Sequence, residues 1–141
     1  MSLEQFNFLL LIMAITGLVV FVALYFVEAG YGKMISDKWG PAINNKVAWV
    51  IMECPVFFVM LYLWAMSERT FEVAPLAMFL IFQTHYFQRS FIFPCILKGK
   101  SKMPISVMMM GMIFNTLNGF MQGEWIFYLS PEDMYTAEWL A

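Results

Sequence analysis

Charged side chains are scarce in this chain: Asp, Glu, Lys and Arg together make up 13% of its 141 residues, and the formal net charge is −2. Because this charge is so small, the sequence does not suggest a nucleic acid or another polyanion as a partner. Hydrophobic residues, by contrast, account for 62% of the chain and aromatic residues for 18%. One soluble core of this size cannot bury so many apolar side chains, so the composition predicts an integral membrane protein.

Residues that bind metals or form disulfides are also few. The chain contains one histidine and two cysteines, Cys54 and Cys95, without a Cys-x-x-Cys pair. A dedicated zinc site needs more such ligands, so no metal is predicted. Both cysteines lie within long apolar segments, and we interpret them as packed thiols because a buried cysteine behaves as a small hydrophobic side chain.

Long apolar segments dominate the sequence. A bilayer core about 30 Å thick needs roughly 20 mostly apolar residues per helix. Four windows meet this requirement, which predicts an all-α membrane protein with a single domain, residues 1–141, of four antiparallel transmembrane helices. The helices are expected at about residues 6–27, 47–66, 73–97 and 104–129. The first window lacks a basic leading region and a small-residue cleavage site, so it is expected to be a retained helix.

The lysines orient these helices. They cluster in two connections, with Lys33, Lys38 and Lys46 in the first and Lys98, Lys100 and Lys102 in the third. The positive-inside rule therefore predicts that the first and third connections are cytoplasmic and that both termini lie on the opposite side. A bacterial inner membrane and an endoplasmic reticulum membrane both fit this pattern.

Glu53 is the only carboxylate in the apolar run from Val47 to Ser67. An ionisable side chain at membrane depth is costly and indicates a functional site by default. The structural alternative is that Glu53 pairs with a basic neighbour such as Arg89 or reaches the nearer interface.

Other polar residues lie at a similar depth. At 1.5 Å per residue, Glu53 lies roughly 10 Å and Tyr86 roughly 16 Å from the cytoplasmic ends of their helices. On the fourth helix, Asn115 and Asn118 lie roughly 16 and 21 Å deep. Asn115, Asn118 and Gln122 also share one helical face. These side chains can therefore form one polar layer in the cytoplasmic half.

A buried acid and a phenol suit one type of chemistry. A carboxylic acid kept neutral by apolar surroundings and a tyrosine hydroxyl can both donate hydrogen bonds to a carbonyl oxygen that gains negative charge. Glu53 and Tyr86 could thus polarise an enone. Since no side chain supplies a hydride, a reduction would need a nicotinamide cofactor.

Four short motifs support this hypothesis: Tyr31-Gly-Lys33, Ala48-Trp49 followed by Glu53-Cys-Pro55, His85-Tyr86-Phe-Gln-Arg89-Ser-Phe91, and Asn118-Gly-Phe-Met-Gln122-Gly123. In order and spacing they resemble the amino-terminal half of the steroid 5-alpha-reductase family. The resemblance implies the first four helices of a seven-helix fold. It further implies an NADPH-dependent reductase of the 4,5 double bond of 3-oxo-4-ene steroids, in which Glu53 and Tyr86 hold the C3 carbonyl while hydride passes to C5.

The resemblance also suggests further site residues. Tyr31, Trp49, Phe114 and Asn118 match positions expected to bind substrate, and Lys33 and Arg89 are candidate partners for polar groups of the cofactor. Most cofactor contacts of the family lie in its last three helices. The NADPH site is therefore expected to need further helices, from the rest of a longer protein or from a second chain.

Two other functions stay open. A related reductase could act on a polyprenol or an enoyl-thioester lipid. Alternatively, the chain could be a non-enzymatic helical subunit of the membrane, in which the polar layer serves assembly. The expected partners are accordingly the lipid bilayer and a steroid or another apolar enone lipid.

Overall fold

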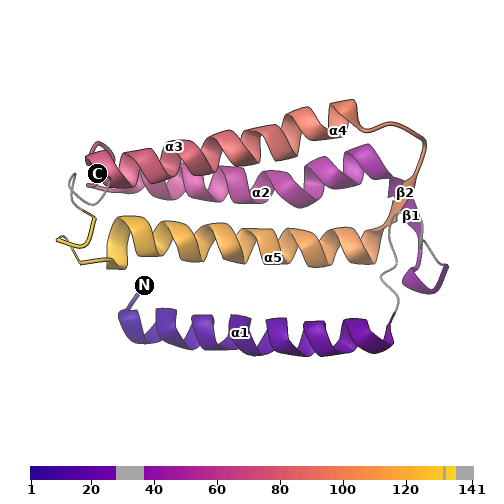
Figure 1. The fold of residues 1–141 in the computed structure, drawn as a ribbon, viewed down its shortest axis with the longest axis horizontal. Helices are drawn as coiled ribbons and strands as arrows, with labels where there is room; N and C mark the ends of the chain where they lie inside the picture. Colours follow the sequence, from indigo (N-terminus) through magenta and orange to yellow (C-terminus); the bar gives the residue numbers. More distant parts are fainter. Residues whose placement is uncertain (28–36, 132, 136–141) are drawn as a thin grey trace.

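The computed structural model describes residues 1–27, 37–131 and 133–135 of the chain. The described part is mostly helical, as predicted, and consecutive long helices run in opposite directions (Figure 1). The helices are α1 (Leu3–Phe26), η2 (Asp37–Trp39), α2 (Asn45–Met66), α3 (Val73–Phe87), η3 (Gln88–Ile92), α4 (Phe93–Ile96), α5 (Ile105–Glu124) and η4 (Trp125–Leu129). Helical structure thus covers each of the four predicted segments.

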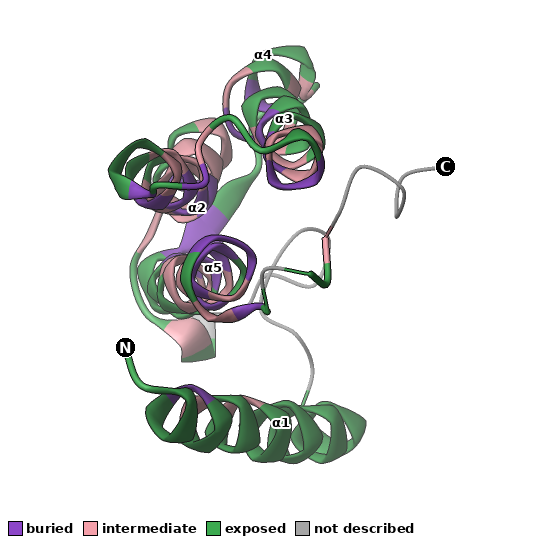
Figure 2. Ribbon diagram, turned by 90° about the vertical axis from the view of Figure 1, so that its left-hand side faces the viewer, coloured by how far each residue is buried: buried purple, intermediate pink, exposed green. Residues whose placement is uncertain are grey.

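Two of these helices have the length and composition of membrane spans. α1 has 24 residues and α2 has 22, and both are apolar enough to cross a bilayer. That all four segments span the membrane stays a prediction. Figure 2 shows α1 at the edge of the bundle with an almost wholly exposed surface, and Phe6 is its buried residue.

A short antiparallel ribbon, which was not predicted, joins the first and third connections. It consists of β1 (Ala42–Asn44) and β2 (Lys102–Pro104). Each strand leads directly into a long helix, because α2 follows β1 and α5 follows β2. The side chain of Asn44 caps α2 by accepting a hydrogen bond from the backbone N–H of Lys46 at 2.9 Å. The ribbon therefore starts α2 and α5 at a similar level, which places their polar residues at matching depths.

Glycines allow α2 and α5 to approach closely. A Cβ atom added at Gly119 would lie 2.8 Å from Val56 Cγ2 and 3.1 Å from the Val56 carbonyl oxygen. One turn later, a Cβ atom at Gly123 would lie 2.6 Å from Leu63 Cδ1. Small residues are the usual means of close helix packing in membranes. The helix that approaches this face of α5 closely is α2.

Gly119→Ala is expected to lower the free energy of unfolding by about 1–3 kcal/mol, the usual cost of overpacking. The new methyl group would meet the Val56 backbone, which cannot turn away. Gly111→Ala should cost less, because there the methyl group would meet Met52, whose flexible side chain can move. Thermal unfolding in detergent micelles would compare the two variants. Equal losses would contradict the proposed close contact at Gly119.

Candidate functional site

Glu53 is buried between two polar partners, with 1% of its surface exposed. Its Oε1 atom accepts from Arg89 Nη2 at 2.8 Å, and its Oε2 atom accepts from Asn115 Nδ2 at 3.2 Å. Asn115 Nδ2 also lies 3.0 Å from the carbonyl oxygen of Met52. We call Glu53, Arg89 and Asn115 the acid cluster. The Glu53–Arg89 ion pair in this cluster is the contact that the sequence analysis offered as a purely structural role for Glu53.

Arg89 lies in a widened helical turn. η3 is a π-helix in which the backbone N–H of Phe93 bonds to the carbonyl of Gln88, five residues earlier. Such turns are uncommon and occur frequently at functional sites. Pro94 follows directly and has no backbone N–H. The indole N–H of Trp49 donates to the Arg89 carbonyl oxygen at 3.2 Å, so the ring reaches this turn from α2.

Tyr86 belongs to a second group of polar side chains. Its hydroxyl oxygen accepts from Asn118 Nδ2 at 3.3 Å, and Asn118 Oδ1 accepts from Gln122 Nε2 at 2.9 Å. We call Tyr86, Asn118 and Gln122 the amide cluster. Within the described part of the chain, no hydrogen bond joins Tyr86 to Glu53. The two clusters are nevertheless neighbours, since Tyr86 lies three residues before Arg89 and Asn118 lies three residues after Asn115, about one helical turn in each case.

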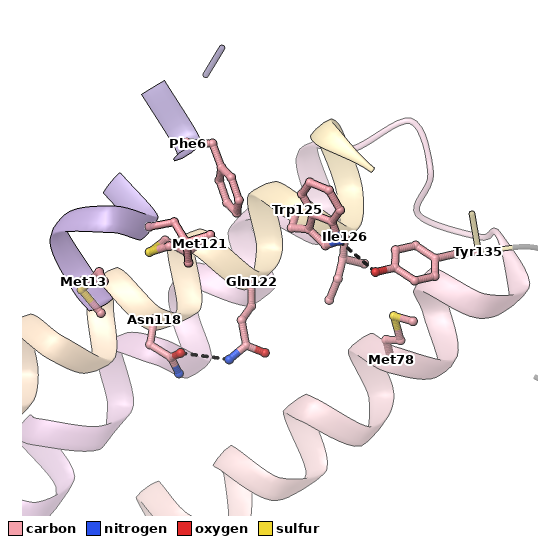
Figure 3. Close-up of a pocket in the computed structure, with 10 residues that line it drawn as sticks. Phe6, Met13, Met78, Asn118, Met121, Gln122, Trp125, Ile126 and Tyr135 are labelled. Atoms are coloured by element: carbon pink, nitrogen blue, oxygen red, sulfur yellow. Dashed lines mark hydrogen bonds between the residues drawn. The ribbon is translucent and has the colours of Figure 1, made fainter. Parts of the chain in front are cut away.

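A cavity of about 450 Å³ lies beside the amide cluster. Its wall is formed by Phe6, Leu10, Met13, Met78, Asn118, Met121, Gln122, Trp125, Ile126 and Tyr135, so most of it is apolar (Figure 3). Asn118 and Gln122 supply polar groups from α5, and Trp125 donates to the Tyr135 hydroxyl at 2.8 Å. A cavity of this size with few polar groups suits one apolar ligand of moderate size.

The predicted site residues occupy different places around this cavity. Asn118 lines it, whereas Tyr86 is not part of the wall and is joined to it through its hydrogen bond with Asn118. Phe114 lies one turn before Asn118 on the same face of α5, is 56% exposed and is not part of the wall. Trp49 contacts Arg89 instead of the cavity. The predictions for Tyr31 and Lys33 lie outside the described residues.

Several wall residues were not among the predicted site residues. Trp125 lies seven residues after Asn118, so helical spacing could have placed it on the same face of the fourth helix. Phe6 stacks on Trp125 with ring centroids 5.6 Å apart. Contacts of this kind between separate helices leave no signal in the local sequence.

The described residues do not fit the charged part of a nicotinamide dinucleotide. Its phosphates need cationic side chains or the N-terminus of a helix. No lysine or arginine belongs to the described wall of the cavity, and Arg89 is paired with Glu53. No cofactor-dependent step can therefore be assigned to these side chains, and the cavity suits only an apolar molecule.

The sequence is similar to those of several known proteins. No model of a protein family matches it. It is 32% identical over 125 residues to "Steroid 5-alpha-reductase DET2" of Gossypium hirsutum, which covers 86% of this chain and 48% of that protein. It is 33% identical over 122 residues to "3-oxo-5-alpha-steroid 4-dehydrogenase 2" of Sus scrofa, covering 84% and 46% respectively. The chain spans about half the length of these relatives.

The mostly helical fold, with two apolar helices long enough to cross a bilayer, is consistent with a helical membrane protein. More particularly, the chain is a homologue of the steroid 5-alpha-reductases and corresponds to the amino-terminal half of these proteins. The resemblance inferred from the four sequence motifs is thereby confirmed.

Proposed function

We propose that this chain takes part in an NADPH-dependent, membrane-embedded reductase that saturates the 4,5 double bond of 3-oxo-4-ene steroids, with hydride passing to C5. In this proposal all four helical segments span the membrane as one domain, and the first and third connections face the cytoplasm. One observation carries the proposal beyond homology: Asn118 both lines the apolar cavity and binds the Tyr86 hydroxyl. The cofactor site would be built outside the described residues.

Tyr86 is the proposed donor to the steroid carbonyl. Its oxygen accepts from Asn118, which in turn accepts from Gln122, so the Tyr86 hydrogen can point to a further acceptor. Hydrogen bonds arranged in one direction polarise one another. As the double bond is reduced, the C3 oxygen gains negative charge, and a preorganised donor stabilises that charge more than the neutral ground state.

Glu53 is the second proposed polarising group. As an ionised carboxylate paired with Arg89 it can only accept hydrogen bonds. It could donate directly to the C3 carbonyl after gaining a proton and losing Arg89, as the resemblance implies. It could also act indirectly, as one partner of an ion pair that keeps the surroundings of Tyr86 free of net charge. The ion pair favours this second route.

The test is steroid binding followed by turnover. Purified chain in detergent should bind progesterone or testosterone saturably, with quenching of tryptophan fluorescence because Trp125 lines the cavity. Membranes from cells that express the protein should convert the same steroid to its 5-alpha-reduced product in the presence of NADPH. Reduction of a polyprenol or an enoyl thioester without competition by steroid would support the related lipid reductase instead. Absence of saturable steroid binding would overturn the proposal.

A further inference from the structure

The backbone of η3 leaves one carbonyl group that needs an external donor. The Phe93 N–H is used by the Gln88 carbonyl. In the next position of the π-turn, the Arg89 carbonyl would need an N–H from residue 94, but this residue is Pro94. Buried or half-buried backbone carbonyls are almost always paired. The indole N–H of Trp49, 3.2 Å away, supplies the missing hydrogen bond.

Trp49 also contacts the Arg89 side chain. The guanidinium carbon lies 5.2 Å from the centroid of the Trp49 ring, which is the geometry of a cation–π interaction. Phe93 also packs against the Trp49 ring, with centroids 5.0 Å apart. Since Trp49 and Glu53 are four residues apart on α2, they present the indole and the carboxylate on one helical face. Arg89 is thus held by its backbone, by its π-contact and by its ion pair.

We propose that Trp49 is a positioning residue that holds Arg89 on Glu53, so that the pair beside Tyr86 carries no net charge. The functional part of this inference rests on the proposed reductase activity. Without Arg89 at its place, the ionised Glu53 would put an uncompensated negative charge near the oxygen that gains negative charge during reduction. Such a charge would oppose the reaction. Trp49 thereby acts on the steroid through Arg89 and does not need to touch it.

The position of Arg89 can be measured without any steroid. Phenylglyoxal modifies arginine side chains, and mass spectrometry separates the modification of Arg89 from that of Arg69. Trp49→Leu should raise the modification rate of Arg89 about tenfold, because it removes both a cation–π contact and a hydrogen bond. Trp49→Phe keeps a ring for the guanidinium and should give a smaller increase. The rate at Arg69, which is 9% exposed, should not change.

Trp64→Phe is the matched control. Trp64 lies on the same helix, its indole N–H donates to the Thr70 carbonyl oxygen at 2.9 Å, and its ring stacks on Phe79. The substitution therefore removes the same kind of hydrogen bond from α2, away from the acid cluster. It should leave the modification rate of Arg89 unchanged. An unchanged rate in both Trp49 variants would overturn the positioning role.

The effect of Trp49 on the proposed reaction can be measured as the stretching frequency of the C3 carbonyl group in a bound steroid. Difference infrared spectroscopy with steroid labelled at C3 should show a lowered carbonyl stretching frequency in the wild type, and Trp49→Leu should lose most of this shift. In an Arg89→Leu background, Trp49→Leu should cause no further loss of the shift, although thermal stability still falls because the indole bonds to the backbone. Trp49→Leu could raise the modification rate of Arg89 and yet leave the carbonyl stretching frequency of the bound steroid at its wild-type value. That result would overturn the functional consequence. Absence of steroid binding in the wild type would overturn the proposed function, while the modification rates still decide the positioning role.

Discussion

Arg89→Leu is expected to lower the free energy of unfolding by about 3 kcal/mol, in the range measured for breaking buried ion pairs from one side. The physical reason is the different exposure of the two partners. The side chain of Glu53 is 2% exposed, so without Arg89 its charge would be buried with Asn115 as its remaining hydrogen-bond donor. Glu53→Gln should cost less, because the side chain of Arg89 is 42% exposed and can reach solvent.

The double variant Glu53→Gln/Arg89→Leu provides the control. It removes both charges, so it should regain most of the stability that Arg89→Leu loses. Thermal unfolding in detergent micelles, followed by circular dichroism, would rank the three variants. A loss of less than about 0.5 kcal/mol in Arg89→Leu would mean that the pair behaves as an exposed ion pair.

Tyr86→Phe is expected to reduce the kcat of the proposed reductase by about 100- to 1000-fold, the usual loss when one donor to a developing oxyanion is removed. The variant keeps the ring, which packs against Phe82 with centroids 4.5 Å apart, so folding should be retained. It removes the hydroxyl group that receives the hydrogen bond from Asn118. KM should change much less than kcat, because this interaction strengthens only as the steroid oxygen gains charge.

Tyr128→Phe is the matched control for this prediction. The Tyr128 hydroxyl donates to the Leu63 carbonyl oxygen at 3.0 Å, and the residue does not belong to the wall of the cavity. Turnover of steroid by membranes that contain either variant, normalised to the amount of folded protein, would compare the two. Equal rates would show that Tyr86 does not polarise the steroid carbonyl.

The sequence alone predicted the helical segments and several of the polar side chains that form hydrogen bonds in the structure. Long apolar runs are a local property, so they located the helices to within a few residues. The isolated carboxylate at Glu53 identified the centre of the acid cluster. The spacing of Asn118 and Gln122 predicted that they share a face, and the structure joins them by a hydrogen bond. Family motifs indicated the relationship that the comparisons confirm.

Only the tertiary structure decided which of these side chains meet. Glu53 and Tyr86 were expected to act on one carbonyl group, yet Glu53 is bonded to Arg89 and Asn115 while Tyr86 is bonded to Asn118. Partners between helices depend on the rotation and axial position of each helix. Three features set the rotation and axial position of the helices here: the β1–β2 ribbon, the contact of Gly119 with Val56 and the π-turn of η3. None of these three follows from the local periodicity of the sequence, because each depends on contacts between distant segments or on the exact turn of the backbone.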